Sequence, residues 1–331
     1  MAVAPSPHTG CRAAEPSAAA PLLTWIGPSE RGQQRALEAR CAQVGRPLLP
    51  SSAPVPRARR LLVATWNLHD GRGDILGLVR ALSRGIADEP APDAIVILLQ
   101  EVIRARPASP AGHGGLVQHR ATGVQDIPAI VDDLGWHFAY LPGRRNRLRP
   151  TGAADADRGV AILSSLPISD LEAIELPVER QRRVALAGLV HGSAPGGRPW
   201  RLRVVSAHLE NRPGARRLWA SAAAARTRQA EALLDALTLS HIDGAASLPI
   251  VVGGDFNVWL GLREDALRRL RRALGTFPAE DARPTMVQNA WRLDYLFPRL
   301  PATMPTTHRR LDSPFGSDHY PVVAMLDFGS D

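Results

Sequence analysis

The sequence predicts an α/β protein with mixed β-sheets and helices on the outside. From Arg60 onward, short apolar runs alternate with helical patterns. Some neighbouring strands are separated by helices and others by loops alone, which favours mixed sheets over a purely parallel one. With 45% hydrophobic and 22% charged side chains among 331 residues, the chain is typical of soluble globular proteins and is not disordered overall.

The N-terminal part of the chain differs from the rest in composition. Residues 1–59 carry nine prolines and long Ala/Ser/Pro stretches, so they have too little apolar surface to offset the entropy of ordering. We therefore expect a mostly flexible extension with a short helix near 29–43, followed by one domain over 60–331. Residues 1–20 lack both a basic start and a clean apolar stretch, so we expect no signal peptide and a cytoplasmic location.

The expected elements follow from apolar periodicity and from Gly, Pro and Asp punctuation. Helices are predicted near residues 74–84, 127–134, 215–239 and 263–274. Strands are predicted over residues 61–66, 94–99, 137–141, 160–164, 184–190, 202–207, 250–253, 293–297 and 322–326.

Membrane and disulfide-rich classes find no support in the sequence. Arg, Asp, Pro or Gly interrupts every apolar run before it reaches about 18 residues, so we expect no membrane span. Cys11 and Cys41 are the two cysteines of the chain. They offer neither a disulfide framework nor a thiolate zinc site, and they fit a reducing compartment.

The net charge suggests an anionic partner without identifying it. The chain carries a formal charge of +8, and all of its Lys/Arg positions are arginine. Together with the excess of Ala, Gly and Pro, this is typical of GC-rich coding. The charge is compatible with nucleic acid, a phospholipid surface or a phosphorylated metabolite, and it does not choose among them.

Polar side chains recur where the predicted strands end, which is where α/β folds place their sites. These residues are Asn67, Glu101, His208, Asp255, Asn257, Asp294, Asp318 and His319. Each has a structural explanation when taken alone, because Asn and Asp cap helices and turns and a lone His is usually structural. Together they offer hard oxygen ligands and two histidines for acid–base work, a set that suits Mg²⁺ better than zinc.

Several motifs strengthen this interpretation. In chain order they are Thr65-Trp66-Asn67, Leu99-Gln100-Glu101-Val102, Arg158-Gly159-Val160-Ala161-Ile162-Leu163-Ser164, Ser206-Ala207-His208-Leu209, Gly254-Asp255-Phe256-Asn257, Leu293-Asp294-Tyr295 and Ser317-Asp318-His319-Tyr320-Pro321. In order and spacing, they resemble the endonuclease/exonuclease/phosphatase superfamily over residues 60–328. The resemblance implies a four-layer α/β sandwich, in which two mixed sheets pack face to face with helices outside, and a Mg²⁺-dependent phosphoesterase site at one end.

The resemblance also implies roles for the metal-site residues. Asn67 and Glu101 match the family's metal-site positions, with Glu101 the principal ligand, and Asp318 is a further candidate ligand. Mg²⁺ is the expected ion, and Mn²⁺ is a substitute that the same oxygen ligands would accept.

The remaining matches concern proton transfer and the phosphoryl group. Asp255 and Asn257 match the pair that positions the attacking water and the phosphoryl oxygens. His319 matches the general-base histidine, oriented by Asp318 or Asp294, and the sequence leaves open whether Asp255 or His319 takes the proton of the water. His208 matches the residue that stabilises the pentacovalent phosphorus or protonates the leaving oxygen.

Arginines are the candidate contacts to substrate. Arg182 and Arg183 directly precede a predicted strand, in a segment that resembles a recurring stretch of bacterial relatives, so one of them is expected to reach the substrate phosphate. The basic segment 143–149 could contact phosphates or form a solvated loop.

Three functions remain open at this level. The leading one is a Mg²⁺-dependent phosphodiesterase, with DNA or RNA as the first substrate class to test. The second is hydrolysis of a phospholipid head group or an inositol phosphate by the same site. The third is a catalytically silent binding module, which is disfavoured because a silent relative has no chemical need for the metal carboxylate and both histidines. The sequence does not indicate an oligomeric state.

Overall fold

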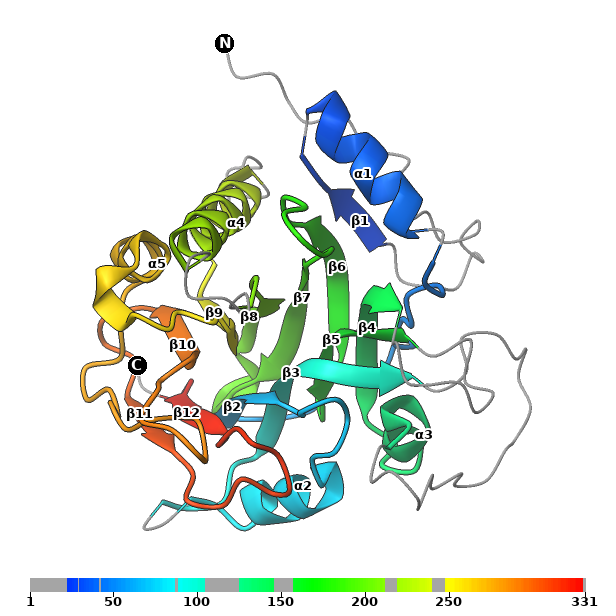
Figure 1. The fold of residues 1–331 in the computed structure, drawn as a ribbon. Coiled ribbons are helices and arrows are strands. Elements are labelled where there is room, and N and C mark those ends of the chain that lie inside the picture. The colour runs from blue at the N-terminus through cyan, green and yellow to red at the C-terminus, as the bar shows by residue number, and fades with distance from the viewer. Residues whose placement is uncertain are drawn as a thin grey trace.

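Two six-stranded β-sheets form the centre of the protein in the computed structural model (Figure 1). The structure describes residues 23–28, 30–41, 43–86, 89–104, 125–145, 157–211, 219–239 and 248–329. The first sheet has the order β1-β6-β7-β8-β9-β10. Its strands are β1 (Leu23–Ile26), β6 (Ile168–Glu175), β7 (Val184–Ser193), β8 (Pro199–His208), β9 (Ile250–Asp255) and β10 (Asp294–Arg299).

The second sheet has the order β11-β12-β2-β3-β5-β4. Its strands are β2 (Arg60–Asn67), β3 (Ala94–Arg104), β4 (His137–Arg145), β5 (Asp157–Ser164), β11 (Thr306–Arg310) and β12 (Val322–Asp327). Both sheets are mixed, because β8 and β9 in the first and β2 and β3 in the second run parallel, whereas most other neighbours run antiparallel.

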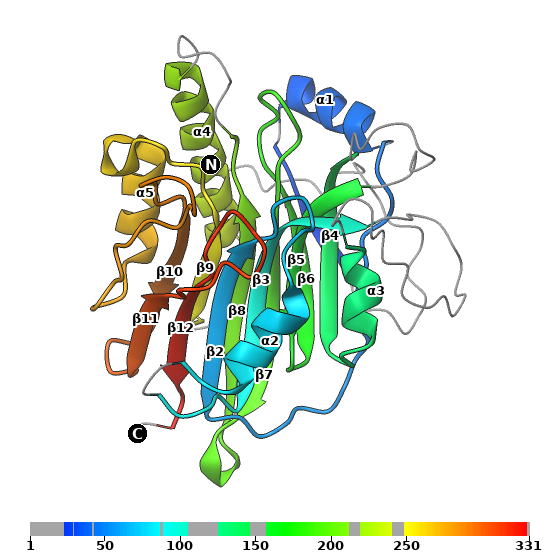
Figure 2. The ribbon, with the colours of Figure 1, turned by 60° about the horizontal axis from the view of Figure 1, so that its bottom comes forward.

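Helices cover the outer faces of both sheets, which confirms the expected four-layer sandwich (Figures 1 and 2). Helices α4 (Trp219–Leu239) and α5 (Asp265–Leu274) pack on the first sheet, and α2 (Ile75–Ser83) and α3 (Ile127–Asp132) pack on the second. Each of these helices overlaps a helix predicted from periodicity. Among the described residues, no helix is long and apolar enough to cross a membrane.

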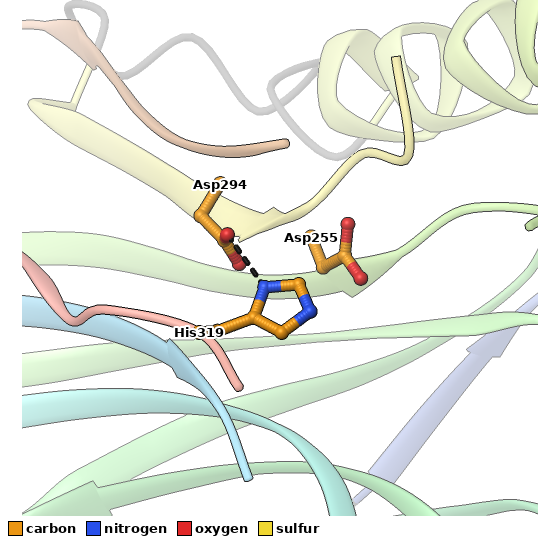
Figure 3. A group of neighbouring side chains, drawn as sticks. All are labelled: Asp255, Asp294 and His319. Atoms are coloured by element: carbon orange, nitrogen blue, oxygen red, sulfur yellow. Dashed lines mark hydrogen bonds and ion pairs between the residues drawn. The ribbon is translucent and has the colours of Figure 1, made fainter. Parts of the chain in front are cut away.

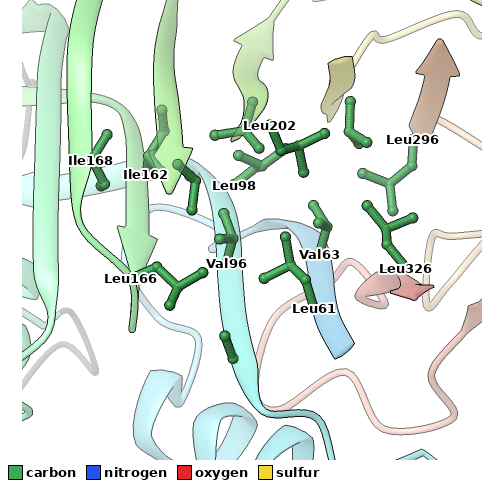
Figure 4. Close-up of a cluster of buried hydrophobic side chains, with 14 of the residues drawn as sticks. Leu61, Val63, Val96, Leu98, Ile162, Leu166, Ile168, Leu202, Leu296 and Leu326 are labelled. Carbon is green, nitrogen blue, oxygen red and sulfur yellow. The ribbon is translucent and has the colours of Figure 1, made fainter. Parts of the chain in front are cut away.

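The strands alternate side chains between the inter-sheet core and the helix layer. In β2, Leu61 and Val63 face the other sheet, whereas Leu62 and Ala64 pack toward the helices. Figure 4 shows the inter-sheet cluster, to which β3 contributes Val96 and other strands contribute leucines and isoleucines. The continuous apolar runs of the sequence therefore reflect strands that are buried on both faces.

All nine predicted strands are present, and three further strands escaped prediction. β11 is a polar edge strand, and β6 has an irregular register between Ser169 and Glu172. β1 has four residues and adds to the edge of the first sheet, parallel to β6. It belongs to the segment expected to be mostly flexible, as does α1 (Arg31–Cys41), which lies beside it in Figure 1.

One expectation about the cysteines is wrong. Cys41, the last residue of α1, is disulfide-bonded. Two cysteines in the whole chain were too few to indicate a disulfide framework. The inference of a reducing compartment, which rested on unpaired cysteines, loses its support.

Candidate active site

The space between the two sheets is apolar along most of its length and polar at one end. On the inward face of β2, Leu61 and Val63 are followed by Thr65 and Asn67, and every one of these side chains is buried. The inward faces of three other strands change in the same way. They end in Gln100 on β3, Ser206 and His208 on β8, and Asp255 on β9. The two-residue strand period thus brings polar groups from four strands to one place.

Close approach of the sheets requires small residues on β9. A Cβ atom at Gly253 would lie 2.7 Å from both Leu98 and Leu296, so the strand has no room for a side chain there. Asp255 is the next residue of β9 on the face toward the other sheet, and it is also the last residue of the strand.

Two of the polar residues depend on unusual backbone conformations. Glu101 has φ +54° at a bulge between Leu99 and Val102 in β3, and Asn257 has φ +51° just after β9. A left-handed φ is unfavourable for most residues and often marks a functional site. The bulge takes Glu101 out of the regular alternation of the strand.

His319 and Asp294 form a buried pair (Figure 3). The Nδ1 atom of His319 lies 2.7 Å from Oδ2 of Asp294, and Asp255 offers a carboxylate oxygen within the same 4.8 Å cluster. Burial lowers the pKa of His319, but the neighbouring carboxylates, above all Asp294, outweigh it and raise the pKa to about 10. Of the two expected orienting carboxylates, Asp294 holds Nδ1, whereas Asp318 lies 3.8 Å from Nε2.

Asp255 is held by both asparagines of the predicted set. Its Oδ2 accepts hydrogen bonds from the side-chain amides of Asn67 at 3.0 Å and Asn257 at 3.3 Å, and its Oδ1 accepts one from the backbone N–H of Asn257. His208 Nε2 lies 3.5 Å from the same Oδ2. Burial and the nearby charge of Asp294 raise the pKa of Asp255 to about 6. Asp255 is therefore the central carboxylate of the cluster.

Glu101 and Asp318 lie at the border of this cluster. Oε2 of Glu101 accepts a hydrogen bond from the backbone N–H of Asp70, and Arg158, which also pairs with Asp70, lies 3.5 Å from it. Burial raises the pKa of Glu101, so its negative charge is not fully compensated by these partners. Asp318 lies 3.5 Å from Nδ1 of His69.

The donor set fits a hard divalent cation. Glu101, Asp255 and Asp294 are three carboxylates at one end of the sandwich, and Oδ1 of Asp294 is buried without a hydrogen-bond partner. Magnesium and manganese prefer such oxygen ligands. The side chain of Asn67 is otherwise engaged, because its amide donates to Asp255 and its Oδ1 accepts the N–H of His69. A cation would therefore find its free oxygens on the carboxylates rather than on Asn67.

Arg182 and Arg183 occupy different environments although they are adjacent. The guanidinium of Arg182 forms a two-pronged ion pair with Glu175 and donates to the carbonyl oxygens of Pro142 and Gly143. Arg183 is 6% exposed, its Nε has no partner, and its ion-pair distance to Glu210 is 3.9 Å. Burial and the neighbouring Arg144 lower the pKa of Arg183 to about 10.

Arg183 lines a small hollow together with two residues of the candidate site. This hollow of about 20 Å³ has Glu101, His208, Arg144, Arg158 and Arg183 in its lining. Burial and the two arginines Arg183 and Arg144 hold the pKa of His208 well below its ordinary value. His208 is therefore neutral and faces a positively charged wall.

Sequence reasoning missed several supporting residues. Thr285 accepts hydrogen bonds from the backbone N–H groups of Leu293 and Asp294, and Gln100 donates to Thr65 and Ser206 between the sheets. Nothing around Thr285 in the sequence indicates this role. Gln100 directly precedes Glu101 in the motif Leu99-Gln100-Glu101-Val102. Its position at the end of a predicted strand could therefore have indicated its role.

The comparisons with known proteins concern the family and the fold of the chain. The model of the Endonuclease/Exonuclease/phosphatase family matches residues 64–319. The chain belongs to this family. Its members hydrolyse phosphoester bonds, and the match covers every catalytic and metal residue expected from the sequence.

Solved structures share the fold. An endonuclease/exonuclease/phosphatase from Beutenbergia cavernae is 24% identical, with a TM-score of 0.56, over 82% of this chain and 72% of that chain. A family protein from Leptotrichia buccalis is 14% identical, with a TM-score of 0.53, over 81% of this chain and 100% of that chain. No curated protein has significant sequence similarity to this chain.

Proposed function

We propose that this protein is a Mg²⁺-dependent phosphodiesterase, with nucleic acid as its first candidate substrate. The observation that supports this most is the buried Asp294–His319 pair beside Asp255, at the point where both sheets end. Hydrolysis of a phosphodiester needs an oriented water, neutralised phosphoryl oxygens and help for the leaving alkoxide. The residues of this cluster can meet all three needs.

The carboxylate of Glu101 would hold the divalent ion, which would neutralise phosphoryl charge when it is bound. The two asparagines fix the carboxylate plane of Asp255, so that Asp255 can accept the proton of an attacking water. Asp294 keeps His319 protonated and oriented, so that Nε2 donates a hydrogen bond to a phosphoryl oxygen. This assigns the base to Asp255 and charge stabilisation to His319.

His208 and Arg183 complete the proposed site on the other side of Asp255. Because His208 is neutral, it acts as a hydrogen-bond donor to the phosphorane rather than as the acid that protonates the leaving group. Arg183 is buried with an unpartnered Nε, and it contacts the phosphate. Arg182 is committed to Glu175, so we assign the phosphate contact to Arg183 alone.

The test is hydrolysis by the purified protein in Mg²⁺, in Mn²⁺ and in EDTA. The substrates are plasmid DNA, single-stranded RNA, sphingomyelin and inositol phosphates, and the controls are the variants His319→Ala and Asp294→Asn. We expect metal-dependent cleavage of nucleic acid that falls about 10³-fold or more in both variants, as when the orienting Asp of a catalytic His is lost. Unchanged activity in His319→Ala would refute the assignment.

Hydrolysis of phospholipid head groups is the second candidate, and a specific observation favours it. The large apolar side chains Leu260, Leu262 and Val287 are 42%, 57% and 40% exposed. Leu260 and Leu262 follow the Asp255–Asn257 segment, and the N–H of Val287 donates to the carbonyl of Asp318. Cleavage of sphingomyelin but not of nucleic acid would select this function.

A further inference from the structure

The Asp294–His319 pair joins two segments that belong to different sheets. Asp294 is the first residue of β10 in the first sheet, whereas His319 precedes β12 in the second sheet. Figure 3 shows the imidazole of His319 turned toward the carboxylate of Asp294. The 2.7 Å contact between Nδ1 and Oδ2 therefore depends on how the two backbones are held relative to each other.

The backbone at Asp294 is bound by the side chain of a threonine. β10 lies at the edge of the first sheet, with β9 as its neighbour on one side. An edge strand has backbone N–H groups that need other acceptors, and buried N–H groups are rarely left unpaired. The N–H groups of Leu293 and Asp294 both donate to the hydroxyl of Thr285, at 3.0 and 3.2 Å. Thr285 is 1% exposed, so water does not replace it as the acceptor.

The main chain of the same threonine is bound to the segment that carries His319. The carbonyl oxygen of Thr285 accepts the N–H of Tyr320 at 2.7 Å. The next residue, Met286, forms an antiparallel bridge with His319. Thr285 is thus bonded to both halves of the pair, to Asp294 through its hydroxyl and to the neighbour of His319 through its carbonyl group.

We propose that Thr285 is a positioning residue that fixes the distance between Asp294 and His319. This inference rests on the proposed phosphodiesterase function and adds a residue that acts through the pair rather than on the substrate. A shift of one backbone relative to the other would lengthen the contact between Nδ1 and Oδ2. Hydrogen bonds weaken steeply when their geometry is lost, and a charge-assisted bond has more to lose.

The other backbone contacts of His319 hold it to the second sheet. The indole Nε1 of Trp66 on β2 donates to the carbonyl oxygen of His319 at 2.9 Å, and the N–H of His319 donates to the hydroxyl of Ser317 at 3.0 Å. The same hydroxyl donates to the carbonyl oxygen of Asn67 at the end of β2. These bonds place His319 on β2, and Thr285 relates that position to β10.

The test compares Thr285→Val with Thr285→Ser. Valine has nearly the shape of threonine but cannot accept the two N–H groups, whereas serine keeps the hydroxyl. The probe is bis-p-nitrophenyl phosphate in Mg²⁺. We expect kcat of Thr285→Val to fall about 10²-fold, as for a misplaced catalytic group, with KM within about threefold of the wild type. Thr285→Ser should restore kcat to within about threefold of the wild type.

A spectroscopic measurement tests the geometry without hydrolysis. In EDTA, the proton on Nδ1 of His319 should give a downfield NMR signal, because it lies in a short hydrogen bond to a carboxylate. His319→Gln assigns this signal by removing it. We expect Thr285→Ser to keep the signal and Thr285→Val to lose it. A lower thermal midpoint in Thr285→Val with the signal and kcat of the wild type would mean a purely structural role and would overturn the proposal.

Ser164→Ala is the matched control. The hydroxyl of Ser164 is buried and accepts the backbone N–H of Leu166 at 2.9 Å. Ser164 pairs with Val96 near the start of β3, several residues before Glu101. This variant should lose stability but keep the NMR signal and kcat. Equal losses of the signal in Ser164→Ala and Thr285→Val would overturn the proposal.

Two further outcomes keep the test decisive. Thr285→Ala is measured beside Thr285→Val, so that a valine variant that fails to fold still leaves a result. It should show the same two losses, and a wild-type signal with wild-type kcat would overturn the proposal. A wild type that hydrolyses no phosphodiester would refute the proposed function, whereas loss of the NMR signal in Thr285→Val would still support the positioning role. The two failures are therefore distinguishable.

Discussion

Adjacent arginines show how strongly the surroundings decide what a residue does. Arg182 and Arg183 both precede β7, and both are more than nine-tenths buried. Arg182 has a carboxylate and two carbonyl oxygens as partners, whereas Arg183 faces the hollow with its Nε unpartnered. A buried charge without full compensation is costly, so it is retained where a ligand supplies the counter-charge.

This contrast predicts opposite outcomes for two conservative variants. Arg183→Gln should lower kcat/KM for a phosphodiester about 10²-fold or more while the thermal midpoint stays within a few degrees. Arg182→Gln should destabilise the fold by about 3–5 kcal/mol, because it leaves Glu175 buried and unpaired. Steady-state kinetics and urea unfolding of both proteins measure the two effects. An Arg183→Gln enzyme with wild-type kcat/KM would show that Arg183 does not contact the phosphate.

At the scale of the element, most strands were predictable because burial on both faces leaves a simple apolar signature. β2 and β3 illustrate this, since each carries core residues on both sides. β11, with the sequence TTHRR, has no such signature, and it forms because the exposed edge of β12 offers hydrogen-bond partners. The bulge at Glu101 is also a product of packing, and no local sequence pattern indicates it.

The central residue of β11 predicts a pH-dependent stability. His308 stacks on Phe277, and its Nδ1 accepts a hydrogen bond from the N–H of Asp281, so it is buried in the neutral form. Burial, followed by the charge of Arg292, lowers the pKa of His308 to about 4. Between pH 6.5 and 4 the unfolded chain binds a proton at this histidine and the folded protein does not. The folded state therefore loses stability as the pH falls through this window.

We expect the loss attributable to His308 to be about 2–3 kcal/mol between pH 6.5 and pH 4. The measurement is the free energy of unfolding in urea at several pH values, for the wild type and for His308→Gln, whose side chain does not titrate. The difference between the two proteins should change with pH in this window and level off above pH 7. Parallel pH profiles would show that His308 does not titrate at a lowered pKa in the folded state.

For the whole molecule, the sequence motifs were sufficient to name residues that the fold brings together in the candidate site, but not the surroundings of that site. Asn67, Asp255, Asn257 and His319 meet at one end of the sandwich because strands far apart in the chain end there. The pairing of His319 with Asp294 rather than Asp318, and the pairing of β1 with the edge strand β6, depend on tertiary contacts. Spacing along the chain cannot reveal such contacts.

If Glu101 and its neighbours hold a divalent ion, as proposed, the stability of the whole protein should depend on that ion. Burial raises the pKa of Glu101 and raises that of Asp255 to about 6, so the folded protein without a cation holds negative charge that it compensates only in part. A divalent ion that binds the folded state and not the unfolded chain stabilises by RT ln(1 + [L]/Kd), about 2.7 kcal/mol at a hundredfold excess over Kd. We therefore expect Mg²⁺ and Mn²⁺ to raise the thermal midpoint by several degrees.

Glu101→Gln tests this expectation, because its stability relative to the wild type should depend on whether metal is present. Without metal, the variant should be at least as stable as the wild type, because it removes an incompletely compensated buried charge. With metal, the rise in the midpoint should disappear, because the proposed principal ligand is lost. Glu38→Gln, which changes an exposed carboxylate of α1, should keep the full rise. If Glu101→Gln keeps the rise as well, the cation does not bind at Glu101.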